Sequence, residues 1–283
     1  MCARGDGCTV GEGRCNLIHY VDSSFTELCR NPFDNYKPYE NNWVLLKLIE
    51  KAEFFLHTSG GADSIFNLII TKENKDWRYR VFDFIQYEKA HGNNMIISVN
   101  KNDLDDAKRI YGHHSFKDNY LRAYEQKVLM HSTDKDSYNA ITKDGILKSW
   151  NILNSEHRIS ESHPIGKLLG DPFDYSDYIM FTNGGVFSEV VVASKQKGYI
   201  EMDIDCTYTA GARLYFDCEK IAKDGLLVRD GAHLKVKNQL LIDKYLIWTA
   251  TPAVLDLQEN TTPQLFAEKA DTYFKEKFPK FNC

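Results

Sequence analysis

The sequence predicts an α+β protein with a smaller, β-rich N-terminal lobe and a C-terminal lobe in which strands and helices alternate. Two observations lead to this fold class. Residues 53–99 hold several short runs of β-branched and aromatic side chains, separated by turn residues. From residue 127 onward, short apolar strands alternate with short helical patterns. A break near residues 120–126 separates the two parts, so we expect an irregular segment at 1–42, an N-terminal lobe at 43–122 and a C-terminal lobe at 123–283.

The composition is that of an ordinary soluble globular protein. The 283 residues, 43% of them apolar and 27% charged, suffice to bury a core in one large domain or two small ones. No run of about 18 apolar residues is present, and the N-terminus lacks the apolar centre of a signal peptide. The seven cysteines are scattered and match no zinc motif, which predicts reduced thiols in a cytoplasmic protein that binds no membrane. The net charge of −5 argues against a surface coated for nucleic acid, although it allows a local basic patch.

The N-terminal elements can be predicted in chain order. Residues 1–42 are polar and rich in glycine, asparagine and proline, so we expect one short helix at 24–29 and otherwise irregular chain. Residues 43–52 are predicted to form a helix, because their apolar side chains recur on one helical stripe. A second helix, capped by Asn100 or Asn102, is expected to reach about residue 111. The strands predicted between these helices are residues 53–58, 65–70, 77–87 and 95–99, which look like antiparallel hairpins.

The C-terminal elements follow the same reasoning. An apolar strand at 127–132 is followed by a helix over about 137–144, and a short helix is expected at 219–223. The further strands are predicted at residues 178–181, 190–193, 199–204 and 213–216.

One short motif in the N-terminal lobe resembles a phosphate-binding loop. The segment Ser59-Gly60-Gly61-Ala62-Asp63-Ser64 looks like the loop with which ATP pyrophosphatases cradle a pyrophosphate. In such a loop, backbone N–H groups converge on phosphate oxygens, and the N-terminus of a following helix adds positive charge. The residues that follow, 65–70, are mostly β-branched or aromatic, which favours a strand. A hairpin turn therefore fits at least as well, and an ATP pyrophosphatase is the alternative function.

The first residues of the C-terminal lobe resemble a second class of enzyme. The strand at 127–132 leads into His131-Ser132-Thr133, and Gly145 follows after a helical segment. This arrangement resembles the opening of ADP-ribosyltransferase folds. There, an imidazole and a hydroxyl at a strand end hydrogen-bond the ribose of NAD. The resemblance implies that His131, Ser132, Thr133 and Gly145 contribute to an NAD site.

Further stretches are similar to one family within that fold, the NAD-dependent RNA 2′-phosphotransferases. Residues 213–246 look like the last part of that family, in which a strand leads through a short helix to a final hairpin. Residues 109–115 resemble its Arg-x-x-x-Gly-His-Ser element, and a strand beginning at Tyr178 occupies the place of another family strand. The resemblance covers about residues 109–250. The N-terminal lobe departs from it, because Leu-Cys-Arg-Asn-Pro at residues 28–32 replaces the family's Leu-Arg-His-x-Pro.

The resemblance implies a reaction and a set of roles. An internal 2′-phosphate of an RNA attacks C1″ of the nicotinamide ribose and releases nicotinamide, and the ribose 2″-hydroxyl then takes the phosphoryl group. Arg109, His114 and Arg229 would bind the attacking phosphate, and Tyr178 would join the NAD site. Arginine suits the first task, because its guanidinium binds phosphate through two parallel hydrogen bonds and stays charged. NAD is thus the expected co-substrate, RNA bearing a 2′-phosphate the expected partner, and no metal is expected.

Other interpretations of these residues remain open. Arg109 has the position of a last-turn helix arginine, and Arg229 that of a solvated charge in a hairpin turn. Glu189 stands where transferases that modify macromolecules often have a catalytic glutamate, or is the charge of an edge strand. ADP-ribosylation of a macromolecule is thus a further alternative. Another is a nucleotide-binding module without catalytic activity.

Overall fold

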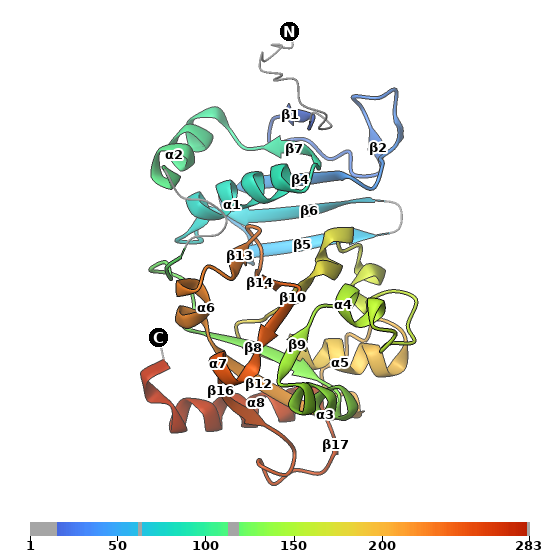
Figure 1. Cartoon of the computed structure of the whole chain (residues 1–283). Helices are drawn as coiled ribbons and strands as arrows, with labels where there is room; N and C mark the ends of the chain where they lie inside the picture. Colours follow the sequence, from blue (N-terminus) through green and yellow to red (C-terminus); the bar gives the residue numbers. More distant parts are fainter. Residues whose placement is uncertain (1–15, 62–63, 113–118, 282–283) are drawn as a thin grey trace.

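The computed structural model describes residues 16–61, 64–112 and 119–281. Within them the chain is α+β and forms two lobes stacked along the long axis of the molecule, with helices and strands in both (Figure 1). The predicted fold class is confirmed at this level.

A five-stranded sheet forms the centre of the N-terminal lobe. Its strands lie in the order β1-β7-β4-β6-β5, and β1, β7, β4 and β6 run parallel to one another. Only the edge strand β5 is antiparallel, to β6. The strands are β1 (Ile18–Tyr20), β4 (Trp43–Ile49), β5 (Leu56–Gly61), β6 (Ser64–Thr71) and β7 (Asn94–Ser98).

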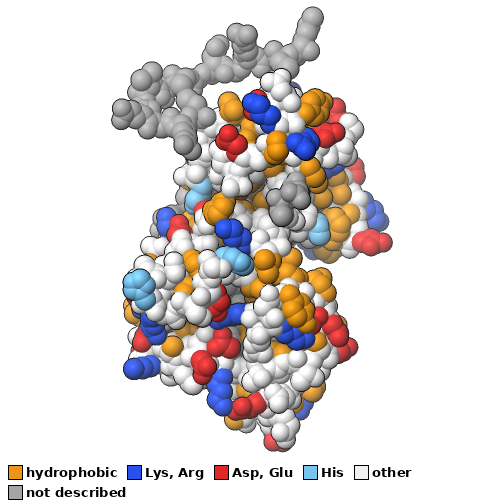
Figure 2. Space-filling model, turned by 90° about the vertical axis from the view of Figure 1, so that its right-hand side faces the viewer, with side chains coloured by type: hydrophobic (Ala, Val, Ile, Leu, Met, Phe, Trp, Pro, Cys, Tyr) orange, Lys and Arg blue, Asp and Glu red, His pale blue; other side chains and the backbone are white. Residues whose placement is uncertain are grey.

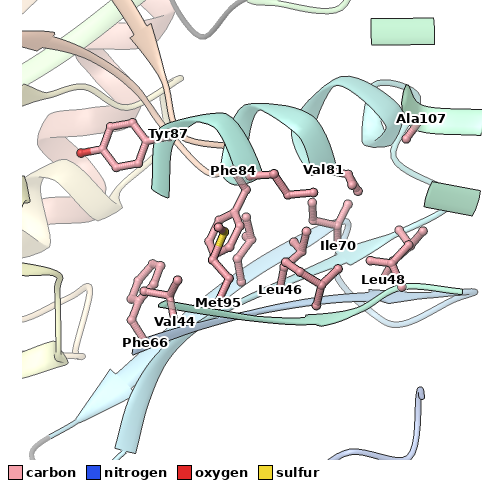
Figure 3. Packing of buried hydrophobic residues seen from close by; sticks show 14 of the residues in the cluster. Val44, Leu46, Leu48, Phe66, Ile70, Val81, Phe84, Tyr87, Met95 and Ala107 are labelled. Carbon is pink, nitrogen blue, oxygen red and sulfur yellow. The ribbon is translucent and has the colours of Figure 1, made fainter. Parts of the chain in front are cut away.

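Two helices cover one face of this sheet. The helix α1 (Trp77–Ala90) crosses from β6 to β7, and α2 (Lys101–Tyr111) packs beside it. Val81 and Phe84 of α1 point onto Leu46 and Ile70 of the sheet, and all four side chains are buried (Figure 3). The helix α2 begins where predicted, since the Asn100 side chain accepts a hydrogen bond from the backbone N–H of Asp103.

The opposite face is covered by the chain before β4. Between β1 and β4, this segment contains the short hairpin β2 (Arg30–Asn31) and β3 (Lys37–Pro38) and is otherwise irregular, so the short helix expected at 24–29 is not formed. Partly buried side chains, Phe25 and Leu28 among them, pack there against Trp43 and Ile96. The sheet is therefore covered on both faces, as a largely parallel sheet requires.

Three predictions in this lobe are wrong, and burial explains the first two. Residues 43–52 were expected to be helical, but the segment contains β4, in which Trp43–Leu46 are all buried. A strand covered on both faces has an almost continuous apolar sequence, which also fits a helical stripe. Residues 77–87 were expected to be a strand and lie in α1, whose buried aromatic residues Trp77, Phe84 and Tyr87 belong to the core that covers the sheet. The antiparallel hairpins expected over 53–99 reduce to one, β5 with β6.

Two small sheets form the framework of the C-terminal lobe. One has the order β16-β12-β8 and the other β10-β14-β13, and all their pairings are antiparallel. Paired backbone hydrogen bonds between Met130 and Thr182 join the two sheets. The six strands are β8 (Val128–Thr133), β10 (Tyr178–Met180), β12 (Ala212–Asp217), β13 (Leu227–Arg229), β14 (Leu234–Lys237) and β16 (Leu246–Ala250).

Helices and short strand pairs surround these two sheets. The helices are α3 (Lys135–Asp144), α4 (Trp150–Ser155), α5 (Phe187–Lys197), α6 (Cys218–Lys223), α7 (Ile242–Tyr245) and α8 (Pro263–Lys277), with the 3-10 helices η1 (Ile165–Leu169), η2 (Phe173–Asp177) and η3 (Pro279–Phe281). The remaining strands are β9 (Ile146–Lys148), paired with β15 (Gln239–Leu241), and β11 (Tyr208–Thr209), paired with β17 (Asn260–Thr261).

Alternating side chains of β8 and β12 point into two separate cores. Leu129 and Leu214 lie in one core, whereas Met130 and Tyr215 lie in the other, beneath α5 and α8. The predicted strands at 127–132, 178–181 and 213–216 are confirmed, as are the helices at 137–144 and 219–223. The strand predicted at 190–193 is wrong, because those residues lie in α5. The strand predicted at 199–204 is not formed.

The two lobes share buried residues at their junction. Tyr175, Tyr178 and Val228 of the C-terminal lobe belong to the same buried cluster as α1 and the parallel sheet. Lys235 is fully buried there, with its Nζ 2.7 Å from Asp230 and over the rings of three tyrosines, Tyr87, Tyr175 and Tyr178. The junction is thus a packed core with a buried ion pair in it.

A buried carboxyl group of α1 makes stability at this junction depend on pH. Burial, above all, raises the pKa of Glu88 to about 8, and one carboxyl oxygen has no hydrogen-bond partner in the described structure. The folded state therefore holds a proton that the unfolded state, with a pKa near 4.5, releases. As pH rises from roughly 5 to 8, we expect the free energy of unfolding of the wild type to fall relative to that of Glu88→Gln. The expected slope is up to about 1.4 kcal/mol per pH unit.

Urea unfolding of both proteins across this range measures the difference. Glu53→Gln, at an exposed carboxylate, is the control and should follow the wild type. Parallel curves for the wild type and Glu88→Gln would show that Glu88 is already ionised in the folded protein.

Candidate functional site

The carboxyl end of β8 brings the predicted NAD-binding residues to the middle of the C-terminal lobe. His131 pairs with Leu214 of β12, and Ser132 pairs with Arg213. Because side chains alternate along a strand, His131 and Thr133 point to one face and Ser132 to the other. His131 and Ser132 are partly buried and Thr133 is buried.

The imidazole of His131 is fixed by the neighbouring strand. Its Nδ1 lies 3.1 Å from the backbone oxygen of Met180, and the ring packs edge-on against Phe181. Burial lowers the pKa of His131 below its usual value, so the neutral ring is favoured at neutral pH. A neutral ring that donates from Nδ1 to a carbonyl has a lone pair on Nε2. His131 can therefore accept a hydrogen bond from a ligand hydroxyl.

On the other face, Ser132 belongs to a buried network around Arg213. The Ser132 hydroxyl donates to Glu189 Oε1 and lies 3.0 Å from the hydroxyl of Ser188. Tyr208 donates to the second Glu189 oxygen at 2.8 Å. The Arg213 guanidinium donates to Glu189 at 3.2 Å and to Ser188 at 2.5 Å. These contacts fix the position of the Ser132 side chain.

The far side of the same guanidinium is bound by the C-terminal helix. Asp271 of α8 accepts from Arg213 Nε at 2.9 Å and from a terminal nitrogen at 3.0 Å. It also accepts from the Tyr215 hydroxyl at 2.7 Å and from the backbone N–H of Gly185 at 3.1 Å. Arg213 is completely buried and is bound by carboxylates on both sides. Five elements, β8, β11, β12, α5 and α8, thus meet in one polar network.

Glu189 is therefore not the edge-strand charge considered from the sequence. It lies in the first turn of α5 instead of an edge strand, and its side chain is buried. Burial raises the pKa of Glu189, although Arg213 and the hydrogen bonds from Ser132 and Tyr208 oppose that rise. Both of its oxygens accept hydrogen bonds from the protein, so in the described structure its side chain holds Ser132 and Arg213 in place.

Gly145 and Tyr178 have structural surroundings of their own. Gly145 ends α3 in the left-handed conformation, with φ of 68°, and its carbonyl accepts from the N–H of Ile242. Tyr178 is buried at the lobe junction, where its hydroxyl lies 2.9 Å from Nε2 of His91. Burial raises the pKa of Tyr178 to about 12. The Tyr178 side chain thus contacts the N-terminal lobe, whereas Met180, two residues further on, holds His131.

Of the three residues predicted to bind the attacking phosphate, Arg109 and Arg229 share no contact in the described structure. Arg109 is exposed on α2 and pairs with Asp106 one turn earlier. Arg229 is buried, and its guanidinium donates to Glu125 at 2.7 Å and to the backbone oxygen of Tyr120 at 2.8 Å. The solvated turn considered for Arg229 is wrong, since it ends a buried strand. His114 lies outside the described residues.

The glycine-rich motif at 59–64 joins two strands. Ser59 lies in β5 and Ser64 begins β6, so no helix follows the motif. The Ser59 hydroxyl and carbonyl both bond to the Asn67 side chain on the facing strand. The helix N-terminus that a pyrophosphate loop requires is therefore missing. Ala62 and Asp63 lie outside the described residues.

Comparison with known proteins adds no relative. Searches of protein-family models, of curated proteins and of solved structures found no match to this chain. Among the described residues, no group of three or more His, Cys, Asp or Glu side chains is arranged to hold a metal ion. In the same part of the chain, no helix combines the length and apolarity needed to cross a membrane.

Proposed function

We propose that the protein transfers an ADP-ribosyl group from NAD, with the nicotinamide ribose bound at the carboxyl end of β8, in an ADP-ribosyltransferase-like C-terminal lobe. The observation that carries the proposal is the fixed, neutral imidazole of His131 at an interior strand end. Its Nε2, which no described residue hydrogen-bonds, can accept a hydrogen bond from a ribose hydroxyl. The buried network beneath the strand, from Ser132 through Glu189 to Arg213, supports the same role because it makes that strand end rigid.

The proposed reaction exchanges one bond at C1″ of the ribose for another. The bond from C1″ of the ribose to nicotinamide breaks, positive charge develops on the sugar, and an acceptor adds at C1″. Such a reaction depends on positioning and on electrostatic stabilisation. A side chain that orients the ribose hydroxyls acts directly on this step, so His131 is the residue that we place against the substrate.

For the acceptor, the resemblance to RNA 2′-phosphotransferases implies an internal RNA 2′-phosphate. Arg229 already has a carboxylate partner, Glu125, so binding a phosphate would require exchanging one anion for another. The proposal therefore rests on the NAD half of the reaction. The RNA 2′-phosphate enters as the first acceptor to be tried.

Removing the imidazole should weaken NAD binding while the fold is retained. We expect His131→Ala to reduce the binding free energy of NAD by about 1–3 kcal/mol, because a buried hydrogen-bond partner is lost. Isothermal titration calorimetry measures the change. His57→Ala, at an exposed histidine of β5, is the matched control and should bind NAD as the wild type does. Equal affinity of His131→Ala and wild type would remove the NAD site from the end of β8.

The reaction itself is tested with radiolabelled NAD, with and without RNA bearing an internal 2′-phosphate. Release of nicotinamide together with ADP-ribose cyclic phosphate supports the phosphotransferase reaction. A labelled macromolecule instead indicates ADP-ribosylation. Binding without any product would indicate a nucleotide-binding module, and turnover of ATP alone would restore the pyrophosphatase alternative.

A further inference from the structure

A pocket of about 840 Å³ lies at the junction of the two lobes, apart from His131. Its walls come from the chain before β4, from the start of β6, from the end of α1 and from the chain through η1 into η2. Figure 2 looks at the side of the molecule on which these segments lie. The volume is in the range of small-molecule sites and exceeds what a single amino-acid side chain would fill.

The inner wall of the pocket presents hydrogen-bond acceptors. No hydrogen bond or ion pair within the described structure ends on the Asp171 carboxylate. That carboxylate occupies the space that a side chain at Gly166 would fill. Burial raises the pKa of Asp171 to about 6, so the group is mainly ionised at neutral pH. A largely buried carboxylate without a donor calls for one from a ligand.

Two neighbouring side chains add acceptors of the same kind. The Asn93 Nδ2 donates to Glu88 at 2.6 Å, which leaves Asn93 Oδ1 as the atom available to the pocket. Asp174 accepts a hydrogen bond from the Tyr87 hydroxyl through one oxygen, Oδ2. The inner wall therefore offers several acceptors to the donors of a ligand.

The outer rim has a different character. Arg30 and Lys167 line the pocket, both are exposed, and neither pairs with a carboxylate of the described residues. Phe173 is 57% exposed, and Lys167 Nζ lies 4.6 Å from the centre of its ring. Exposed cations beside an open aromatic ring suit a phosphate next to a stacked base.

We propose that this pocket binds a guanine nucleotide, with the base against Asp171 and Asn93 and the phosphate toward Arg30 and Lys167. Guanine carries N–H donors at N1 and N2 on one edge, which a carboxylate can accept in parallel. Adenine has a single amino group on that edge, next to an acceptor. The recognised chemistry is common to free guanosine monophosphate (GMP) and to an unpaired guanine in a single strand. The site does not depend on the NAD reaction.

Isothermal titration calorimetry of the full chain, without NAD, tests the proposal. We expect GMP to bind at least about tenfold more tightly than AMP, as a two-bond base contact provides. Asp171→Asn should abolish most of this preference, because it replaces one acceptor by a donor. Phe173→Ala, at an exposed ring, should weaken GMP binding without threatening the fold. Asp205→Asn, at an exposed aspartate elsewhere, is the control and should leave binding unchanged.

Further arms separate the source of the base from the role of the rim. Lys167→Ala should weaken GMP binding several-fold and leave guanosine unaffected. A single-stranded RNA with unpaired guanines that binds more tightly than GMP would assign the site to a strand, and the reverse order would assign it to the free nucleotide. Equal affinities for GMP and AMP, an unchanged preference in Asp171→Asn, or no binding of any guanine ligand would overturn the proposal.

Discussion

Replacing Arg213 by alanine is expected to lower the free energy of unfolding by about 3–5 kcal/mol, the usual cost of removing one partner from a buried ion pair. The side chain is fully buried between Glu189 and Asp271. Its loss leaves two carboxylates of the network without their cation and an empty space between β12 and α5. Chemical denaturation of the purified variant measures the change.

Two comparisons make this result specific. Arg213→Lys should recover only part of the loss, because one ammonium cannot reach Glu189, Asp271 and the carbonyl of Gly185 together. Arg109→Ala, at an exposed arginine with one carboxylate neighbour, should change stability by less than about 1 kcal/mol. If Arg213→Ala were as stable as Arg109→Ala, the network would have no part in holding the lobe together.

Replacing Lys235 by methionine should destabilise the junction between the lobes by a similar amount, about 3–5 kcal/mol. Because methionine fills the space among the three tyrosine rings, the measured loss of stability comes from removing the charge. Asp230 would stay buried without its principal cation, and the Lys235 ammonium is what mainly holds the pKa of Asp230 well below its usual value. Because the pKa of Asp230 is depressed, the ion pair stabilises the protein at neutral pH. This stabilising contribution is lost as pH falls below about 4.

Lys237→Met is the matched control, because Lys237 lies two residues further along β14 and is exposed. It should unfold within about 0.5 kcal/mol of the wild type. Hydrogen exchange can locate the effect, and in Lys235→Met we expect faster exchange in α1 and β14 than in β8 or β12. Uniform acceleration throughout the chain would show that Lys235 has no particular role at the junction.

Within the N-terminal lobe, the sequence predicted the half-exposed helix α2 better than the elements that are buried between others. The helix at 101–111 has an N-cap and a clear polar face, and it forms where expected. The strand β4 and the helix α1 are buried between other elements, so their apolar residues lack a decisive period. Such segments are assigned by tertiary contacts, which a single sequence does not display.

In the candidate site, too, local sequence patterns predicted some residues, and tertiary contacts determined the others. The strand end at His131 follows from local pattern and lies where expected, at the end of β8. Arg229 looked like a turn residue, because its partner Glu125 lies 104 residues earlier in the chain. Arg213 and Asp271 were missed, although a lone arginine in the apolar run Ala212–Asp217 is a signal that some buried carboxylate must meet it.

The pairing of β8 with β12 also bears on how the chain is made. Thr133 pairs with Ala212, so the ribosome must add about 80 residues before β8 finds its partner strand. At typical synthesis rates this interval is on the order of ten seconds. During that time an apolar strand leaves the exit tunnel with an unpaired edge. Other unfinished chains can pair with such an edge. The strand that carries His131 is thus a segment that a nascent-chain chaperone would shield.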